Sequence, residues 1–268
     1  MSKLPTFTER VGAFWDWYAS VSERFLKTID DGNCSNLATE VSAKIDELLP
    51  DFGWVFGPGE GEAKHSFTLS GNGVFSYQLL ALRWLEMAPA LPGWTFYAAR
   101  QASKPPRGKI QISGLDFEAQ AFWLTPTLDE EDEVFHLIVW HPLFSKIPDK
   151  TQWMALYLFL DEALGEVGVQ NWIGRIEISD RALAGAIPLT ELPDLVQSTA
   201  ERTGWKKYGP GESWSIYCCW MERAACRRSW IHCGRRKFRP ERASSSLRAR
   251  NAGGGLSCKA LADEPGMT

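Results

Sequence analysis

The chain has 268 residues, of which 44% are hydrophobic and 12% aromatic, and its formal net charge is −4. This length and apolar content predict a globular protein with a packed core, and they exclude a fibrous or wholly disordered chain. The longest apolar stretch, Trp153 to Leu160, is far shorter than the roughly 20 residues that cross a bilayer. No apolar leader follows the first residues, so we predict a cytoplasmic protein with no membrane partner.

Charge and cysteine are both divided unevenly along the chain. Residues 1–220 hold 18 Lys and Arg against 29 Asp and Glu, a net −11, whereas residues 221–268 hold 11 against 4, a net +7. Cys34 is alone in the first part, and all other cysteines follow residue 217. We predict one acidic domain over residues 1–217 and a basic tail rich in Arg and Cys over residues 218–268. A single thiol in the domain is typical of a reducing cytosol.

Hydrophobic spacing predicts that two helices open the domain. From Thr8 to Ile29, and again from Asn36 to Leu49, apolar residues recur every three or four positions, as in amphipathic helices. A hairpin follows, with strands around Trp54–Phe56 and His65–Leu69 on either side of a glycine-rich acidic loop.

The later elements predict a fold class. A helix is expected over Tyr77–Met87, and four strands follow it in WTFYAAR, KIQISG, AFWLTPT and EVFHLIVWH. The short loops between these strands favour antiparallel neighbours. A buried helix over Gln152–Leu164, a strand near Trp172–Ile178 and a helix over Thr190–Thr203 complete the domain. This order predicts an α+β fold, with a mostly antiparallel sheet and helices packed on one face.

Three short stretches carry a family resemblance. FWDWY in the first helix, ALPGW followed by F, A and R at a strand, and LTELPDL before the last helix resemble an uncharacterised bacterial protein family of unknown function. The resemblance spans about residues 10–205. It implies the α+β fold and a bacterial cytoplasmic protein, and it brings no catalytic motif and no activity.

Three histidines, His65, His136 and His141, are the candidates for catalytic or metal chemistry. His136 and His141 fall on one predicted strand, where a separation of five turns side chains to opposite faces unless the strand bulges or ends at Trp140. His65 lies on another predicted strand and could approach either of them across the sheet. Histidines in sheets also form ordinary hydrogen bonds or face solvent, so we predict no metal and no cofactor. A metal-dependent or acid–base hydrolase that uses these histidines is the alternative.

Other motifs lack a part that their chemistry needs. GESWS around Ser213 lacks the second glycine of a nucleophile elbow. The acidic run Asp129–Glu133 lacks the central glycine and the spaced carboxylate of a calcium loop. The glycines of GPGEGE precede no helix and carry acids that repel phosphate. The sequence therefore contains no assembled catalytic motif. This absence favours a protein that is not an enzyme, without deciding the point.

Tryptophan is abundant, with 13 residues in the chain. Those in the predicted domain fall mostly on predicted buried faces, which indicates core packing: Trp15, Trp17, Trp54, Trp84, Trp94, Trp123, Trp140, Trp153 and Trp172. Trp17 lies off the main helical stripe and is the candidate binding residue, because aromatic anchors on an acidic surface are typical of protein-binding faces. We therefore predict a non-catalytic protein-binding or regulatory domain, of inhibitor or immunity type, with another protein as its partner.

The basic tail admits three interpretations. Its cysteines and His232 lack the Cys-x-x-Cys spacing of zinc fingers. Its eleven basic residues are suited to salt-sensitive nucleic-acid binding, which we expect of no other part of the chain. Its richness in Arg, Ala, Ser and Gly also matches a GC-rich gene read out of frame, so we hypothesise a frameshift near Cys218. In each case the tail buries little apolar area, and we predict that it is disordered.

Overall fold

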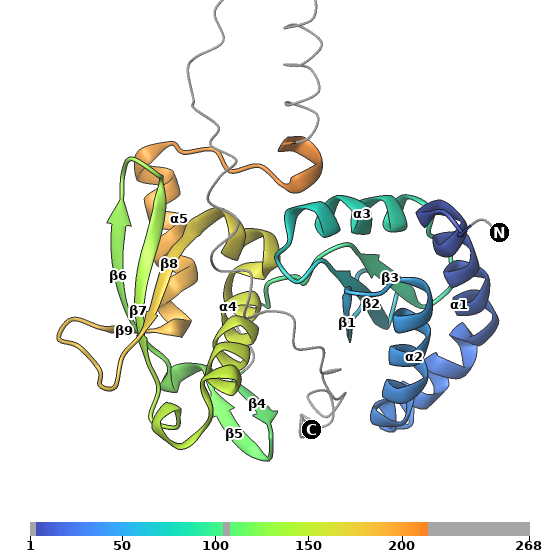
Figure 1. Ribbon diagram of the computed structural model, residues 1–268, viewed down its shortest axis with the longest axis horizontal. Helices are drawn as coiled ribbons and strands as arrows, with labels where there is room; N and C mark the ends of the chain where they lie inside the picture. The colour runs from blue at the N-terminus through green and yellow to red at the C-terminus, as the bar shows by residue number, and fades with distance from the viewer. Residues whose placement is uncertain (1–3, 104–107, 214–268) are drawn as a thin grey trace, which may run out of the picture.

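A computed structural model gives the structure of residues 4–103 and 108–213. The basic tail, with its predicted disorder and the three interpretations given above, lies outside these residues. Within them the predicted α+β class is confirmed, because helices pack on sheets whose strand pairs are mostly antiparallel (Figure 1). None of the described helices combines the length and the apolar character needed to cross a bilayer.

The chain begins with α1 (Phe7–Asp30), the short 3-10 helix η1 (Cys34–Leu37) and α2 (Ala38–Leu48). A capping box starts α1, since the backbone N–H of Glu9 donates to the Thr6 hydroxyl and the Glu9 carboxylate accepts from the Thr6 N–H at 2.6 Å. The apolar stripe of α1, from Val11 through Phe25 to Ile29, is buried, as its period predicts.

The first sheet has the strand order β1-β2-β3, formed by β1 (Gly53–Pro58), β2 (His65–Ser70) and β3 (Trp94–Tyr97), with α3 (Phe75–Glu86) between β2 and β3. Strands β1 and β2 form the predicted antiparallel hairpin. Strand β3 instead lies parallel to β2, which corrects the expectation that it pairs antiparallel with the next strand. The reason is the crossover through α3, because a parallel neighbour needs a connection of this length.

The second half contains a small hairpin of β4 (Lys109–Ile112) and β5 (Leu115–Glu118), and a sheet with the order β8-β7-β6-β9. The strands of this sheet are β6 (Trp123–Asp129), β7 (Val134–Trp140), β8 (Ile173–Ile178) and β9 (Ile187–Pro188). The helices of this half are α4 (Asp149–Trp172), between β7 and β8, and α5 (Leu192–Thr203), after β9. Short 3-10 helices lie at Ala119–Ala121, Phe144–Lys146 and Leu189–Glu191. Strand β8 lies parallel to β7, again after a helical crossover.

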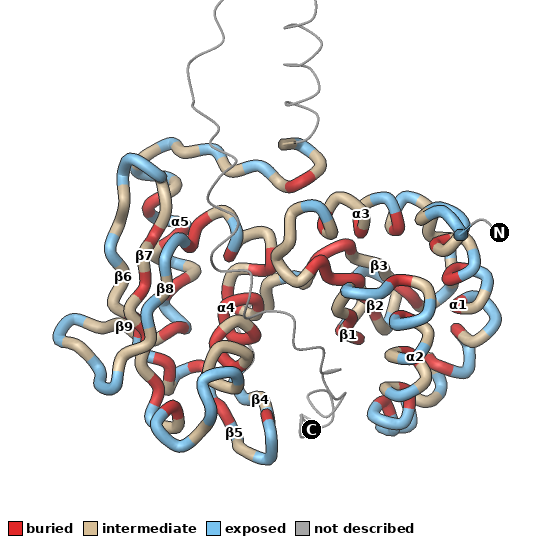
Figure 2. The backbone as a smooth tube through the Cα atoms, viewed as in Figure 1, coloured by how far each residue is buried: buried red, intermediate tan, exposed pale blue. Residues whose placement is uncertain are grey.

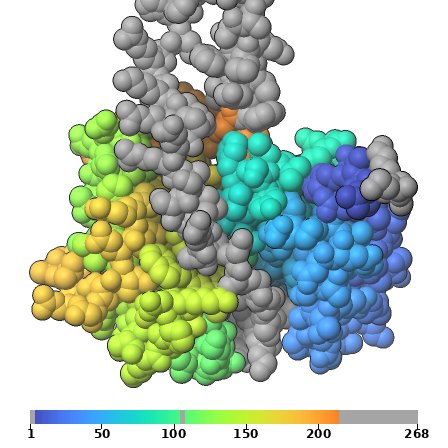
Figure 3. Space-filling model, viewed as in Figure 1, coloured from blue at the N-terminus to red at the C-terminus, as the bar shows by residue number. Residues whose placement is uncertain are grey.

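The buried hydrophobic residues of the described chain form two clusters, one in residues 4–103 and one in residues 108–213. We call these two parts the N-terminal lobe and the C-terminal lobe; they lie side by side in Figure 3. The N-terminal cluster is rich in aromatic rings. Trp15 stacks on Trp84 at 4.5 Å between ring centroids, and its indole N–H donates to the Trp84 carbonyl at 3.0 Å.

In the C-terminal lobe, helices α4 and α5 cover one face of the sheet. The strands supply Leu124, Leu137 and Val139 to that face, and α4 supplies Phe159 and Leu160. Burial alternates along β7 (Figure 2), so every second residue of this strand faces away from the helices. The lobe therefore presents a sheet face that its own helices leave uncovered.

Candidate functional site

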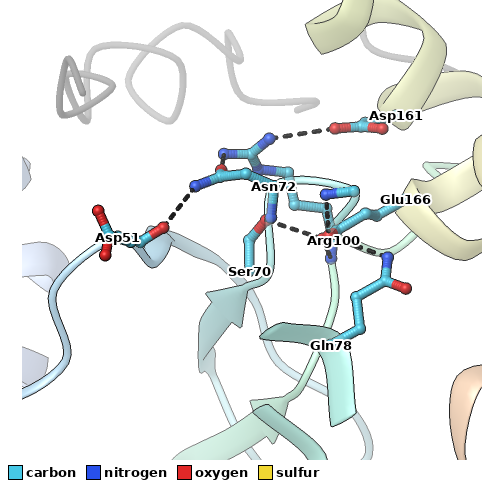
Figure 4. A network of polar contacts seen from close by, with 8 residues as sticks. Asp51, Ser70, Asn72, Gln78, Arg100, Asp161 and Glu166 are labelled. Carbon is cyan, nitrogen blue, oxygen red and sulfur yellow. Dashed lines mark hydrogen bonds and ion pairs between the residues drawn. The ribbon is translucent and has the colours of Figure 1, made fainter. Parts of the chain in front are cut away.

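The two lobes meet at Glu166 of α4 (Figure 4). This residue is only 1% exposed, so its carboxylate is buried. Its two oxygens accept hydrogen bonds from four donors of the N-terminal lobe: the Ser70 hydroxyl at 2.7 Å, the Gly73 N–H at 2.7 Å, the Gln78 amide at 3.1 Å and the Arg100 N–H at 3.3 Å. Four hydrogen bonds match the capacity of a carboxylate, so the cost of burying this charge is offset.

Arg100 adds a second connection between the lobes. Its guanidinium forms an ion pair with Asp161 of α4 at 3.1 Å and contacts the Asn72 amide oxygen at 3.5 Å. The Asn72 amide in turn donates to the Asp51 carbonyl at 3.2 Å. We call this set of residues the lobe junction (Figure 4): Asp51, Ser70, Asn72, Gly73, Gln78, Arg100, Asp161 and Glu166.

Glycine makes the lobe junction possible at two places. At Gly165 the backbone of α4 leaves the helical conformation, with φ at 73° and ψ at 158°, a region essentially confined to glycine. This break lets the Glu166 N–H donate to the Arg100 carbonyl at 2.9 Å. At Gly71, a Cβ atom would lie 2.6 Å from the Gln78 backbone nitrogen. The loop Ser70–Gly73 therefore needs glycine to reach the carboxylate.

The geometry of the lobe junction is suited to holding the two lobes together and not to proton transfer. A general base needs a free acceptor that a substrate proton can reach, and both oxygens of Glu166 are occupied by protein donors. The junction residues come from the end of β2, from α3, from the segment after β3 and from α4. The arrangement holds the N-terminal lobe against the middle of α4.

His65 lies at the start of β2, in the N-terminal lobe, and its Nε2 is 2.9 Å from the Asp30 carboxylate. Lys64 forms an ion pair with the same carboxylate at 3.0 Å. The hydrogen bonds from Lys64 and then from His65 lower the pKa of Asp30 below its ordinary value. The described structure thus places His65 in a small surface ion-pair group that joins α1 to β2.

His136 lies on β7 of the other sheet, so His65 does not share a sheet with it. Its Nδ1 accepts a hydrogen bond from the Arg175 backbone N–H at 2.9 Å, and its Nε2 is 3.3 Å from the Asp129 carboxylate. Backbone hydrogen bonds from Asp132 and Glu131, together with the His136 contact, lower the pKa of Asp129. Because both ring nitrogens have protein partners, this His–Asp pair differs from a catalytic pair, in which one nitrogen faces the nucleophile.

His141 follows the last residue of β7 and is 2% exposed. Its ring packs against Phe122 at 4.4 Å, Phe117 at 5.1 Å and Phe144 at 5.5 Å between centroids. Its Nδ1 accepts from the Leu143 N–H at 3.1 Å, which leaves the proton of the neutral ring on Nε2. Burial lowers the pKa of His141 from 6.5 to about 4, against a smaller opposing effect of Glu118.

The three histidines therefore occupy three different environments, and the geometry does not bring them together. Strand β7 ends at Trp140, which is one of the conditions that binding of one ion by both His136 and His141 would require, yet His141 is buried and His136 is partly exposed. Within residues 4–103 and 108–213, no three His, Cys, Asp or Glu side chains are grouped as metal ligands would be.

Of the nine tryptophans predicted to lie in the core, Trp15, Trp54, Trp84, Trp94 and Trp172 are buried, Trp17, Trp140 and Trp153 are partly buried, and Trp123 is exposed. Trp17, the predicted binding residue, is partly buried on α1, where its ring contacts Phe14 at 5.5 Å and Phe25 at 5.8 Å. Trp123 was expected in the core, and this prediction is wrong because its residue is 37% exposed. Strand β6 turns Leu124 toward the helices, so the residue before it faces the opposite side.

Trp123 belongs to the uncovered face of the C-terminal sheet, which we call the outer face. In the strand register Trp123 lies opposite Trp140, Thr125 opposite Ile138, and Thr127 opposite His136, and directly opposed residues of antiparallel strands share a face. The outer face includes Trp123, Thr125, Thr127, His136, Ile138 and Trp140 of β6 and β7, and Arg175 and Glu177 of β8. The indole N–H of Trp140 donates to the Asp180 carbonyl at 3.1 Å, so the aromatic end of the face is fixed.

Comparison with protein-family models found no match, and neither did comparison with curated proteins or with solved structures. The resemblance to an uncharacterised bacterial family therefore stays a prediction.

Sequence reasoning missed both the lobe junction and the outer face. A signal for the junction exists, because Asp161 and Glu166 follow the apolar run Trp153–Leu160 in and just after a helix predicted to be buried, and buried carboxylates need partners. For the outer face, the alternation of β6 and β7 indicates two faces, but it does not say which one the helices cover.

Proposed function

We propose that this protein is a non-catalytic protein-binding domain of regulatory type, such as an inhibitor or an immunity protein, and that the outer face of the C-terminal lobe binds its partner. The observation that carries the proposal is that Trp123 is exposed, and Ile138 and Trp140 are partly exposed, on a sheet whose other face is packed against α4 and α5. Grouped apolar side chains on a surface are typical of protein interaction sites.

The polar residues support a binding role over a catalytic one. Glu166 and His136 have protein partners at both of their polar atoms, and His141 is enclosed by phenylalanine rings. A hydrolase based on His65, His136 and His141 stays an alternative prediction, as does nucleic-acid binding through the tail. The bacterial origin and the cytoplasmic location also remain predictions from the sequence.

Site-specific photo-crosslinking tests the proposed function. The photoreactive residue p-benzoylphenylalanine replaces Thr125, which lies on the outer face between the two tryptophans and the β6–β7 turn. In an extract of the source organism, we expect one discrete protein adduct from this position. The adduct should disappear when excess unlabelled protein is added, since a specific site is saturable.

Two controls decide the outcome. The same photoreactive residue in place of Ala19, an exposed position on α1, should give no matching adduct. The W123T variant should lose the adduct at position 125, because the partner loses an aromatic anchor. Equal labelling from positions 125 and 19, or an adduct that W123T leaves unchanged, contradicts the proposed function.

A further inference from the structure

We propose that the segment which binds the outer face is positively charged and rich in arginine. This inference rests on the proposed function and adds the chemistry of the partner. Two observations carry it independently of each other: the charge around the outer face, and the pair of tryptophans at one end of it.

Carboxylates surround the outer face. The turn between β6 and β7 and the strands and loop beside it carry Asp129, Glu130, Glu131, Asp132, Glu177 and Asp180. The basic residues of the same region are Arg175, which pairs with Glu177 at 3.3 Å, and Arg181; the adjacent Glu133 pairs with Lys207 at 3.5 Å. Negative charge thus dominates, and a negative surface attracts cationic partners.

The tryptophan pair gives arginine a second means of binding. Indole faces attract cations, and the guanidinium group also stacks on them through its planar shape. Trp123 and Trp140 lie directly opposite each other, and the first is 37% exposed. The same lobe already uses this chemistry, since the Lys207 ammonium lies 5.1 Å from the centroid of Trp172 and 5.8 Å from that of Trp205.

The length of the outer face indicates an extended segment. Trp123 lies at the start of β6, opposite Trp140 at the end of β7, and Asp129 lies at the end of β6, a distance of about 20 Å for a seven-residue strand. An extended peptide of about six or seven residues spans this distance, so its cationic side chains can reach the indoles and the acidic turn at once. A second copy of this lobe, or a nucleic acid, would bring like charges together.

The test measures binding of fluorescein-labelled deca-arginine to the full chain by fluorescence anisotropy, with deca-lysine, deca-glutamate and a single-stranded DNA 20-mer as parallel probes. We expect deca-arginine to bind more tightly than deca-lysine, and the affinity for deca-arginine to fall as salt rises. Any binding of deca-glutamate to the basic tail should be the same in W123T and in the wild type.

Matched variants locate the binding. The variant E130Q/E131Q/D180N removes three exposed carboxylates beside the outer face, and E23Q/D46N/E62Q removes three exposed carboxylates of the N-terminal lobe. We expect the first to weaken deca-arginine binding about fivefold to tenfold and the second by less than about twofold. W123T should weaken binding about threefold to fivefold, whereas Y208A, at another exposed aromatic residue, should not change the affinity.

Several results would overturn the inference. Equal weakening by the two triple variants indicates attraction to net charge alone, and an unchanged affinity in W123T removes the role of the indole. DNA binding that depends on Trp123 favours a nucleic acid as the occupant. Failure here is distinguishable from failure of the proposed function: a partner crosslinked at position 125 that contains no basic segment contradicts only the inference, and absence of a specific adduct contradicts the function.

Discussion

The two lobes share one strand topology and differ in how far the faces of their sheets are buried. In each lobe an antiparallel hairpin is followed by a helix and by a strand parallel to the second hairpin strand: β1, β2, α3 and β3 in one lobe, and β6, β7, α4 and β8 in the other. Both crossovers are helical, as parallel neighbours require.

Burial along the central strand of each lobe shows the difference. In β2, all residues from Ser66 to Ser70 are buried, on both faces of the strand. In β7, only Phe135, Leu137 and Val139 are buried, and the residues between them are partly exposed. A shared topology therefore does not determine which surfaces are available. Because of this contrast, we propose the C-terminal lobe, and not the N-terminal lobe, as the place where a partner binds.

The largest effect is expected from breaking the connection between the lobes. Replacing Glu166 with alanine leaves buried donors of Ser70, Gly73, Gln78 and Arg100 without their acceptor. We expect the free energy of unfolding to fall by about 3 to 5 kcal/mol. Because each lobe has its own core, we also expect urea unfolding of E166A to separate into two transitions. Hydrogen–deuterium exchange of peptides from each lobe measures the two transitions independently.

The matched control for E166A is E191A, which removes an exposed carboxylate of the same lobe. Its effect should stay within about 0.5 kcal/mol, as for most surface substitutions. If E166A unfolds in a single step with a loss as small as that of E191A, the lobe junction does not hold the lobes together.

The sequence predicts the elements of both lobes better than their pairing. Helix α1 agrees with its predicted range to within a residue at each end, because its apolar period is long and a capping box marks its start. The parallel position of β3 depends on how the crossover through α3 returns to the sheet, which no local pattern records. Strand β9, with two residues, is too short to give a periodic signal.

The candidate sites were harder to predict because they depend on contacts distant in sequence. Glu166 and Ser70 are separated by 96 positions, so their pairing follows only from the packing of the lobes. The outer face depends on which side of the sheet α4 and α5 cover, and alternation along a strand is the same for either choice. The acidic character of residues 1–217 and their aromatic richness are the sequence features behind the proposed binding role.

Acid should affect the lobes unequally, because the buried histidine belongs to the C-terminal lobe. Above pH 6.5 His141 is neutral in both the folded and the unfolded chain, and stability is unaffected by its titration. As the pH falls from 6.5 to about 4, the unfolded chain binds a proton that the folded chain excludes, so the free energy of unfolding falls by about 3 kcal/mol. Urea unfolding at pH 7.5, 5.5 and 4 measures this loss.

The variant H141F keeps an aromatic ring among the phenylalanines and removes the titrating group. Its free energy of unfolding should lose most of the pH dependence between 6.5 and 4, whereas H136Q, at a partly exposed histidine, should keep the pH dependence of the wild type. If the free energy of unfolding of H141F depends on pH as strongly as that of the wild type, another group causes the loss of stability in acid.

The smallest effect on stability is expected on the outer face, and it tests the contrast between the lobes directly. Trp54 on β1 is 5% exposed and packs against Phe56 and Phe67 at 5.5 and 6.1 Å between centroids, whereas Trp123 is 37% exposed. We expect W123T to lower the free energy of unfolding by less than about 1 kcal/mol, and W54T by about 3 to 5 kcal/mol. Thermal and urea unfolding of both variants measure the two losses. If W123T lowers the free energy of unfolding as much as W54T does, Trp123 is a core residue. Its side chain would then not be available to bind a partner.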